Sequence, residues 1–408
     1  MKILFITDNF PPESNAPSIR TYEHAKIWVR CGHRVTIITG FPNYPEGIIY
    51  PGYKNLWIRK VNIDGMSVIR VKTFMSANEG IFLRTIDYIS FMIMSLYAGL
   101  LHRNVDVVIA TSPQIFSAVS GFFISLIRGI PFVFELRDLW PSSIIAVGAL
   151  KRSSLIITYL EKMELFLYKR SRLIIAVTEA FRENLIARGI CSKKIAEVTN
   201  GVNLSDFVKS AKDIELAREL RIEGRYVIGY IGTHGMAHAL NVVLSAADLL
   251  RNDSRFAFMF VGSGAERDSL IARSNEIKLP NVYFVESQPR KNITSYWSLC
   301  DIALINLRNE PVFATVIPSK IYEAMAMGIP ILAAIPAGIA TQLVIDCGCG
   351  LTINPGNPIE MAEAIRKLAG DPDLCMRFSR SGVISSRRFD RCRLAVKMAK
   401  IIKRSLDV

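Results

Sequence analysis

Short apolar runs of strand length alternate with longer stretches of helical periodicity along the first half of the chain. Few polar residues interrupt these runs, which is typical of parallel strands covered on both faces. They predict strands at residues 2–7, 34–39, 105–110, 131–135 and 172–177, with helices at 19–30, 115–127 and 155–169 between them. Because strands and helices alternate, the pattern predicts a doubly wound parallel sheet.

A second series begins after the turn-type sequence Asn200-Gly201-Val202. Its apolar runs predict strands at 226–231, 256–261, 282–285, 301–305 and 330–333. The chain closes with a basic amphipathic stretch at 391–406, which predicts a helix. A single hydrophobic core rarely grows beyond about 250–300 residues, so a chain of 408 residues predicts two domains.

We therefore expect an α/β protein of two Rossmann-like domains. Residues 1–203 are predicted to form the first and residues 204–389 the second, while a helix at about 390–408 packs back on the first. Ligands of open α/β sheets bind at the carboxyl ends of the strands. We expect the two domains to face each other across a cleft lined by those ends.

Composition narrows the class of protein. Apolar residues make up 50% of the chain and charged residues 21%, which excludes a disordered chain. Two uncharged stretches, 88–101 and 113–127, are shorter than the roughly 20 residues of a membrane span, and the apolar start at 1–6 is too brief for a signal peptide. The seven cysteines are scattered, and Cys347 and Cys349 lack a second ligand pair, so we expect structural thiols in a cytoplasmic protein.

The net charge of +14 favours a polyanionic partner. Nucleic acid, anionic lipid headgroups and phosphorylated small molecules all fit such a charge. The sequence has no aromatic RNA-binding pattern, no GXXG clamp and no paired zinc ligands. We therefore predict phosphates on a substrate and on lipids as partners, and no nucleic acid.

Two glycine-rich turns follow predicted strands of the second half. Gly232-Thr233-His234-Gly235 is predicted to open a helix at about 241–250, and Gly262 and Gly264 follow the next strand. Small residues let the backbone approach a phosphate, and helix-start amides attract its charge. An ordinary turn of this architecture fits the pattern equally well.

His234 and His238 are four residues apart, a spacing that holds a metal when both lie on a helix. No third ligand is nearby in sequence, and His234 precedes a glycine instead of lying within a helix. We favour a phosphate or sugar contact by His234, and we expect no metal.

The segment from Pro318 to Pro330 carries the sharpest signal. Ser319 is placed to cap a predicted helix, with Lys320 and Glu323 on one face of its first turn and Gly328 at its end. A lysine there can neutralise a diphosphate, and the carboxylate can accept hydrogen bonds from two ribose hydroxyls. A surface ion pair of little energetic consequence is the plainer interpretation.

In the first half, Arg137, Asp138 and Trp140 lie just beyond a predicted strand, where substrate contacts concentrate. A structural cluster at the strand's end is the alternative. Two proline-rich loops, 9–17 and 41–47, follow other strands and are stiff enough to shape a pocket; the second contains Asn43 and Tyr44.

Taken in this order, the motifs resemble glycosyltransferase family 4, whose members are retaining, metal-independent enzymes of the GT-B fold. The resemblance rests on the Pro-Pro-Glu loop at 11–13, the segments 39–45, 137–141 and 200–202, Pro318-Ser319-Lys320 and the stretch 323–326. The sequence looks most like the bacterial branch that builds O-antigen or capsule repeat units, including N-acetyl-fucosamine transferases.

The resemblance implies roles for particular residues. Glu323 matches the glutamate that binds ribose, and Lys320 matches the lysine at the donor diphosphate. Asn15 and Ala16 occupy the place of a paired glycine. Thr315 stands where the family often has another glutamate, and Arg308 is our candidate for a missing basic residue. The donor-binding set is Asn15, Ala16, Gly232, Thr233, His234, Gly262, Gly264, Arg308, Thr315, Pro318, Ser319, Lys320 and Glu323.

The acceptor-binding set is Asn43, Tyr44, Arg137, Asp138 and Trp140, and the catalytic set is Asp138, Lys320 and Glu323. The implied reaction moves a sugar, an N-acetylated amino-deoxyhexose, from a UDP-sugar to a polyprenyl-diphosphate-linked saccharide, with no cofactor. A nucleotide-sugar 2-epimerase and an inactive donor-binding module are the alternatives.

A lipid-linked acceptor places the protein at the inner face of the cytoplasmic membrane, as a peripheral protein. A basic, apolar-rich stretch fits an interfacial surface, to which residues 81–101 add apolar contact. Its cations are Lys151, Arg152, Lys162, Lys169, Arg170 and Arg172. An ordinary packed helix with a solvated basic face is the alternative.

Overall fold

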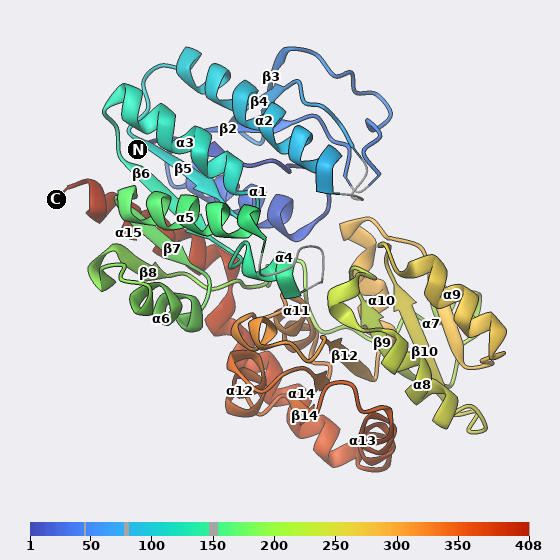
Figure 1. Cartoon of the computed structure of the whole chain (residues 1–408). Coiled ribbons are helices and arrows are strands. Elements are labelled where there is room, and N and C mark those ends of the chain that lie inside the picture. The colour runs from blue at the N-terminus through green and yellow to red at the C-terminus, as the bar shows by residue number, and fades with distance from the viewer. Residues whose placement is uncertain (45, 77–80, 147–153, 408) are drawn as a thin grey trace. The chain divides into compact units, whose positions relative to one another are not determined.

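The computed structural model describes residues 1–44, 46–76, 81–146 and 154–407 (Figure 1). The chain forms two compact units. The first consists of Met1–Asn200 together with Arg391–Val408, and the second of Gly201–Asp390. The chain therefore passes into the second unit at Asn200, close to the predicted position, and returns to the first at Arg391.

The first unit is built on an eight-stranded sheet in the order β3-β4-β2-β1-β5-β6-β7-β8. Its strands are β1 (Lys2–Ile6), β2 (Arg34–Gly40), β3 (Ile58–Ile63), β4 (Met66–Val71), β5 (Val107–Thr111), β6 (Phe132–Leu136), β7 (Leu173–Ala176) and β8 (Ile195–Glu197). Every neighbouring pair is parallel except β3 and β4. The predicted parallel sheet is confirmed.

The antiparallel pair at the edge was not predicted. β3 and β4 are joined by Asp64 and Gly65, with φ angles of 48° and 81°. Two consecutive residues at positive φ are what a tight hairpin turn requires, and an Asp-Gly pair is a strong signal for one. Apolar and polar residues also alternate on both sides of this turn, a pattern that indicates strands.

The helices of the first unit are α1 (Ala16–Arg30), α2 (Ile81–Leu101), α3 (Ile115–Arg128), α4 (Ser142–Ala146), α5 (Leu155–Arg170), α6 (Glu179–Ala187) and α15 (Arg391–Leu406), with a 3₁₀ turn at Ser192–Lys194. α2, α3 and α5 lie side by side over one face of the sheet, and α1 and α15 cover the other (Figure 1).

The C-terminal helix belongs to the core of the first unit. The indole Nε1 of Trp28 on α1 donates a hydrogen bond of 2.8 Å to the carbonyl of Ala395 on α15. Leu394 and Met398 are buried in one cluster with Phe5 of β1. The amphipathic pattern of 391–406 is thereby explained, because its apolar face closes the sheet.

Within the described part of the chain, no helix combines the length and the apolar character that crossing a bilayer requires. The longest helix among the described residues, α2, has 21 residues and carries Arg84 and Asp87 near its start.

The second unit has a six-stranded, fully parallel sheet in the order β11-β10-β9-β12-β13-β14. Its strands are β9 (Tyr226–Ile231), β10 (Phe256–Val261), β11 (Val282–Val285), β12 (Ile302–Asn306), β13 (Ile331–Ala334) and β14 (Gly350–Ile353). Five of these match the predicted strands within one residue, while β14 was not predicted.

The helices of the second unit are α7 (Ile214–Glu219), α8 (Asn241–Leu249), α9 (Arg267–Glu276), α10 (Ile293–Leu299), α11 (Lys320–Met327), α12 (Ile339–Asp346), α13 (Pro358–Gly370) and α14 (Pro372–Ser386), with 3₁₀ turns at Met236–His238, Arg290–Asn292, Pro311–Thr315 and Arg387–Phe389. In each unit, the carboxyl ends of the parallel strands meet at one edge, so the loops that follow them are brought together.

Candidate functional site

Two loops at the carboxyl edge of the second unit's sheet are held against each other by backbone hydrogen bonds. Gly232 N–H donates to the carbonyl of Val261 at 2.9 Å, and His234 N–H donates to that of Ser263 at 2.8 Å. The carbonyl of His234 in turn accepts from Glu266 N–H at 2.9 Å. These bonds bring the two predicted glycine turns into one rigid structure.

Glycine is required at this junction for steric reasons. A Cβ on Gly262 would lie 2.1 Å from the carbonyl oxygen of Gly232, and one on Gly264 would lie 2.5 Å from that of His234. Both glycines have φ near +147°, at +146° and +149°, a region that other residues rarely adopt. The glycines therefore permit the close approach of the two loops.

Lys320 is a buried lysine whose amine has no hydrogen-bond partner among the described residues. Its side chain is 9% exposed, and its Nζ lies 3.6 Å from the centre of the Tyr230 ring. Nζ would also be only 3.1 Å from a Cβ on Gly232. Burial lowers the pKa of Lys320 to about 7, and the carboxylate of Glu323 acts in the opposite direction.

His234 is fully buried next to this lysine, and neither of its ring nitrogens has a hydrogen-bond partner in the described residues. Burial, with smaller effects from the charges of Lys320 and Arg267, lowers the pKa of His234 to about 4. The ring is therefore neutral near pH 7. A neutral imidazole offers one donor and one acceptor to a ligand.

His238 lies on the 3₁₀ turn, not on a helix shared with His234. Its Nδ1 lies 3.3 Å from the carbonyl of Asn306, and burial lowers its pKa to about 3. The described residues contain no group of three His, Cys, Asp or Glu side chains that could hold a metal. His234 therefore lies in the loop before the 3₁₀ turn and His238 lies on that turn, so the two residues do not share a helix.

One expectation about the glycine turn is wrong. Gly232 to Gly235 do not open helix α8, because the 3₁₀ turn and Ala239, at a φ of 45°, intervene before the helix begins at Asn241. The amides of that helix start are therefore not part of the loop that holds Gly232 and His234.

The predicted helix from Lys320 is present as α11, and it ends at Gly328, whose φ is 67°. Ser319 stands at the N-cap position, but its side chain makes no capping hydrogen bond, because its backbone is already helical. The expectation that its hydroxyl caps the helix is therefore wrong. Glu323, half-buried, stands one turn beyond Lys320, and Pro318 precedes the cap.

The two substitute residues lie on loops near this cluster. The backbone N–H of Arg308 donates to the carbonyl of Ala237 at 2.8 Å and so steadies the 3₁₀ turn. Thr315 ends the 3₁₀ turn before α11, and its hydroxyl donates to the carbonyl of Val312 at 2.7 Å. The sequence did not single out Arg267, whose charge acts on His234 and whose guanidinium pairs with Glu286 at 2.8 Å.

Taken together, this cluster has the chemistry of an anion site. It presents a buried lysine, two imidazole nitrogens without partners among the described residues, and a rigid backbone. Because buried polar atoms are normally paired, these groups are suited to bind a ligand. An anion at Nζ would favour the charged form of Lys320 and restore its pKa. The site is therefore prepared for a ligand that carries negative charge, such as a diphosphate.

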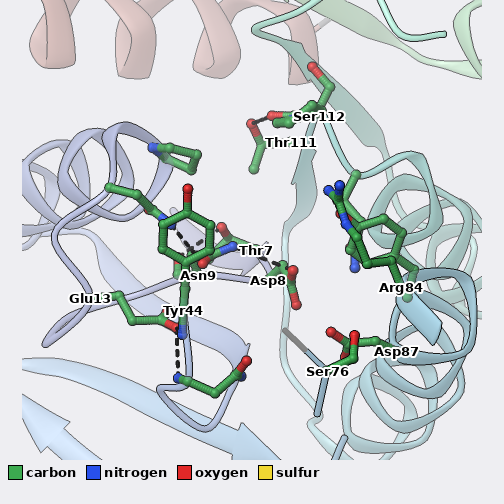
Figure 2. A pocket seen from close by; sticks show the side chains of 16 residues that line it. Thr7, Asp8, Asn9, Glu13, Tyr44, Ser76, Arg84, Asp87, Thr111 and Ser112 are labelled. Carbon is green, nitrogen blue, oxygen red and sulfur yellow. Dashed lines mark hydrogen bonds between the residues drawn. The ribbon is translucent and has the colours of Figure 1, made fainter. Parts of the chain in front are cut away.

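A pocket of about 250 Å³ opens at the carboxyl edge of the first unit's sheet (Figure 2). It is lined by residues that follow β1, β2 and β5 and by the start of α2. Figure 2 shows Asp8 between Tyr44 on one side and Arg84 and Asp87 on the other.

The pocket is acidic. Burial is the main reason that the pKa of Asp8 is raised well above its usual value, and the charges of Asp87 and Glu13 add to the effect. Burial also raises the pKa of Asp87 to about 7. Arg84 lowers both pKa values, and it donates a hydrogen bond of 2.6 Å to the hydroxyl of Tyr88.

Glu13 has a structural role in this pocket. Its carboxylate accepts hydrogen bonds from the backbone N–H groups of Phe10, Asn43 and Tyr44 at 3.0–3.2 Å. It therefore ties the loop after β1 to the loop after β2. Arg70 of β4 strengthens the same junction by donating to the carbonyls of Gly40 and Pro11.

The structure divides the predicted first-unit residues into two groups. Asn43, Tyr44 and Asn15 line the pocket, whereas Arg137, Asp138 and Trp140 do not. The latter three follow β6 and are joined to the pocket wall through Ser112, whose Oγ accepts from Arg137 N–H at 2.8 Å. The strand order explains the split, because β6 lies one position beyond β5.

Asn15 and Ala16 begin helix α1 instead of forming a glycine-like open turn. Asn15 Oδ1 accepts from Ser18 N–H at 3.0 Å, and its Nδ2 donates to Asn9 at 2.8 Å. The Asn15 side chain is therefore occupied as a helix cap. Ala16 is exposed at the first position of the helix.

Several pocket residues escaped the sequence analysis, among them Asp8, Asp87 and Gln114. Asp8 directly follows an apolar strand, a placement that could have identified it. Asp87 and Gln114 stand on helical or loop segments with no recognisable spacing. Lys151 and Arg152, expected in the basic stretch, lie outside the described residues.

Comparison with known proteins now bears on both units. Residues 18–206 match the family described as Glycosyltransferase Family 4, and residues 212–383 match the family described as Glycosyl transferases group 1. The first match lies mainly in the unit with the acidic pocket, and the second in the unit with the anion site.

Two bacterial proteins are similar in sequence. A protein of Pseudomonas aeruginosa named as a probable glycosyltransferase, WbjE, is 24% identical over 71% of this chain and 74% of its own. WcaI of Escherichia coli (strain K12) is 23% identical over 80% of this chain and 82% of its own, and its name assigns it provisionally to colanic acid biosynthesis as a glycosyl transferase.

Among solved structures, Anabaena HepE in complex with UDP-glucose aligns with a TM-score of 0.73 and 18% identity, over 99% of each chain. Similarity at this identity concerns the fold. The fold is GT-B, with two Rossmann-like domains in series, as the sequence motifs implied.

Proposed function

We propose a function from the premise that the two halves of the chain belong to Glycosyltransferase Family 4 and Glycosyl transferases group 1. In this proposal the chain is a retaining, metal-independent enzyme. It transfers a sugar from a UDP-sugar to a polyprenyl-diphosphate-linked saccharide. Its relatives are bacterial glycosyltransferases of polysaccharide biosynthesis. O-antigen or capsule assembly is the pathway class that fits them, and an N-acetylated amino-deoxyhexose is the proposed sugar.

The observation that carries this proposal is the buried, unpartnered amine of Lys320. A lysine in this state lacks a counter-charge, and a donor's diphosphate would supply one. Gly232 and His234 lie around the amine, so a phosphate could meet Nζ and a neutral imidazole together. HepE binds UDP-glucose on the same fold, which supports a nucleotide-sugar ligand.

In the proposed reaction, the bond between the sugar's anomeric carbon and the diphosphate breaks, and negative charge develops on the leaving phosphate. The Lys320 ammonium stabilises that charge in a site of low dielectric, where an electrostatic contribution is large. The acceptor hydroxyl attacks from the same face, and the leaving phosphate takes its proton. Glu323 holds the ribose, so it positions the nucleotide.

The sequence motifs favour Asp138 as a contact of the acceptor or sugar hydroxyls. Its carboxyl lies one strand away from the acidic pocket, and burial raises its pKa. We propose that Asp138, Arg137 and Trp140 contact the acceptor.

We also propose that α2, α3 and α5 dock on the inner face of the cytoplasmic membrane. α2 packs against α3, and α3 packs against α5. All three helices expose large apolar side chains. These include Phe82, Ile93, Leu126, Ile127, Leu155, Ile156 and Tyr159. The exposed cations Lys162, Lys169 and Arg170 on α5 suit anionic headgroups.

Nucleotide binding tests the donor half. We expect calorimetry to detect UDP binding to the wild type, and Lys320→Met to weaken it at least tenfold, about 1.4 kcal/mol. The control is Lys367→Met, at an exposed lysine of α13 in the same unit, which should leave UDP affinity unchanged. Equal affinities for wild type and Lys320→Met would refute the donor assignment.

Product analysis tests the transfer itself. Purified protein, a panel of radiolabelled UDP-sugars and a bacterial polyprenyl-lipid extract should yield a labelled lipid-linked saccharide. Epimerisation of a donor without an acceptor would instead support an epimerase.

Vesicle sedimentation tests the membrane surface. The wild type should bind vesicles of phosphatidylglycerol and phosphatidylcholine, and the double variant Leu155→Ser/Ile156→Ser should bind at least threefold less. Ile384→Ser, at a similarly exposed residue of the second unit, is the control. Equal binding by both variants would exclude α5 from the contact.

A further inference from the structure

The pocket of the first unit contains a polar side chain with unused hydrogen-bonding capacity. Gln114 lines this pocket and is only 7% exposed, yet neither its amide nitrogen nor its oxygen has a partner among the described residues. The hydroxyl of Ser76, at the same pocket, is also buried without a partner. Because buried polar groups are normally paired, this wall of the pocket is suited to a ligand.

The unused groups specify the chemistry of that ligand. The amide of Gln114 offers donors and an acceptor, and the hydroxyl of Ser76 offers one of each. A ligand group that both donates and accepts satisfies them, and a hydroxyl does so in the least space. A purely anionic ligand would satisfy the donors and leave the acceptors unpaired.

The charge of the pocket narrows the choice further. Arg84 is the cation that lowers the pKa values of Asp8 and Asp87, and Arg70 is the cation that lowers the pKa of Glu13. The phenols of Tyr44 and Tyr88 complete the titratable groups of the pocket. Glu13 is already occupied by three backbone N–H groups. Asp8 and Asp87 remain to form hydrogen bonds, and at pH values above the pKa of about 7 of Asp87 its carboxylate repels a ligand that carries its own carboxylate or phosphate.

The size and walls of the pocket fit one sugar ring. Its volume of about 250 Å³ is below the roughly 300–1,000 Å³ of sites that enclose a whole ligand. Tyr44 and Tyr88 line it with aromatic surface, against which the C–H face of a pyranose can pack. Figure 2 shows that Tyr44 and Asp87 reach into the pocket from different elements.

We propose that this pocket is the subsite for the acceptor's sugar, and that it selects a neutral sugar with free vicinal hydroxyls over a uronate or a phosphorylated sugar. Gln114 and Ser76 read one hydroxyl, and Asp8 and Asp87 accept from its neighbours. The assignment of this ligand as the acceptor rests on the proposed function. The selectivity rests on the pocket alone.

Ligand-observed NMR tests the selectivity directly. Saturation transfer from the full chain is measured at pH 8, above the pKa of about 7 of Asp87, to the methyl glycosides of glucose, galactose, mannose, glucuronate and galacturonate. At least one neutral glycoside should show a signal, and its uronate counterpart should be at least fivefold weaker. A uronate that binds as well as its neutral counterpart, or the absence of a signal from every neutral glycoside, would overturn the proposal.

Gln114→Leu removes the amide without changing the charge. We expect it to weaken the glycoside signal at least fivefold and to leave UDP affinity within twofold of the wild type. Gln342→Leu, at an exposed glutamine of α12 in the second unit, is the matched control and should change neither. A wild-type glycoside signal from a folded Gln114→Leu chain would overturn the assignment.

If Gln114→Leu fails to fold, Asp87→Asn replaces it. Removing one negative charge should reduce the preference for the neutral glycoside over its uronate at least threefold, and an unchanged preference would overturn the proposal. Because glycoside binding needs no donor, these experiments test the subsite independently of the proposed function. Loss of UDP binding and transfer with intact glycoside selectivity would refute the function and leave the subsite standing.

Discussion

The two units share an architecture and differ in the charge that gathers at the carboxyl edge of the sheet. In the second unit a lysine and neutral histidines surround tight glycine loops, and in the first unit carboxylates surround an open pocket. One edge is prepared for an anion and the other for a neutral, hydroxyl-bearing ligand. A doubly wound sheet therefore fixes where a ligand binds, and the side chains decide which ligand it is.

The two edges also differ in rigidity. The loops of the second unit are joined by backbone hydrogen bonds at glycines that tolerate no side chain. The loops of the first unit are held by buried side chains instead, through Glu13 and Arg70. Rigid backbone suits a diphosphate, whose shape does not vary between donors, while side chains can be exchanged to suit different acceptors.

The largest effect is expected at the glycine junction. Gly262→Ala should destabilise the second unit by more than about 3 kcal/mol and abolish UDP binding, because its Cβ would lie 2.1 Å from a backbone carbonyl. Thermal unfolding and calorimetry provide the measurements. Gly356→Ala, where φ is 82° and nothing lies within 4 Å, should cost only about 1 kcal/mol. Similar losses in the two variants would show that close approach is not the cause.

The next largest effect is expected at Glu323. Glu323→Ala should lower transfer at least about 100-fold, or 2.7 kcal/mol in the barrier, while the chain keeps its thermal stability. The control is Glu363→Ala, at an exposed glutamate of α13. Transfer rates near the wild type would refute the ribose role and leave only the lysine in the donor site.

The acidic edge should carry a stability cost that depends on pH. The pKa of Asp87 is about 7 in the folded chain against an ordinary value of 3.8, so the folded chain binds the proton more tightly between these values. Stability contributed by the protonated carboxyl is therefore lost as the pH rises from about 4 through 7.

Asp87→Asn should accordingly stabilise the chain at pH 8 by about 1 kcal/mol, after allowance for solvent screening, and have little effect at pH 4. Thermal unfolding at the two pH values is the test. The exposed Asp106→Asn variant serves as the control. A gain at pH 4 that equals the gain at pH 8 would contradict the assigned pKa.

The smallest effect separates two candidate cations of the anionic edge. Arg267→Ala should weaken UDP binding about threefold, because its charge acts on His234, whereas Arg308→Ala should weaken it less. Calorimetry at low ionic strength compares the two variants. A larger loss from Arg308→Ala would restore the residue that the sequence motifs favoured.

Much of the fold followed from the sequence because buried parallel strands are continuous apolar runs. β9, β10 and β11 begin and end where their apolar runs do. The hairpin of β3 and β4 was missed because β3 is mostly exposed and polar residues interrupt the apolar ones in both of its strands, although Asp64-Gly65 marked the turn. Edge strands thus lose the signal that central strands keep.

The candidate sites were predicted unevenly for a related reason. Lys320 and Gly232 could be placed together, because loops after neighbouring parallel strands meet at one edge. Asp8, Asp87 and Gln114 are far apart in the sequence, and only the path from β4 through α2 to β5 brings them to one pocket. The burial of Lys320, which sets its pKa, also depends on packing that no motif encodes.

The proton balance of UDP binding tests the central claim, that the second unit holds a buried lysine for an anionic ligand, most directly. Calorimetry at pH 8 in buffers of different ionisation enthalpy counts the protons taken up when UDP binds. Lys320, with a pKa of about 7, is mostly neutral at that pH, and a diphosphate at its Nζ should charge it. We predict an uptake approaching one proton in the wild type and a much smaller uptake in Lys320→Met at saturating UDP. Identical uptake in the two proteins, or none in the wild type, would contradict the account.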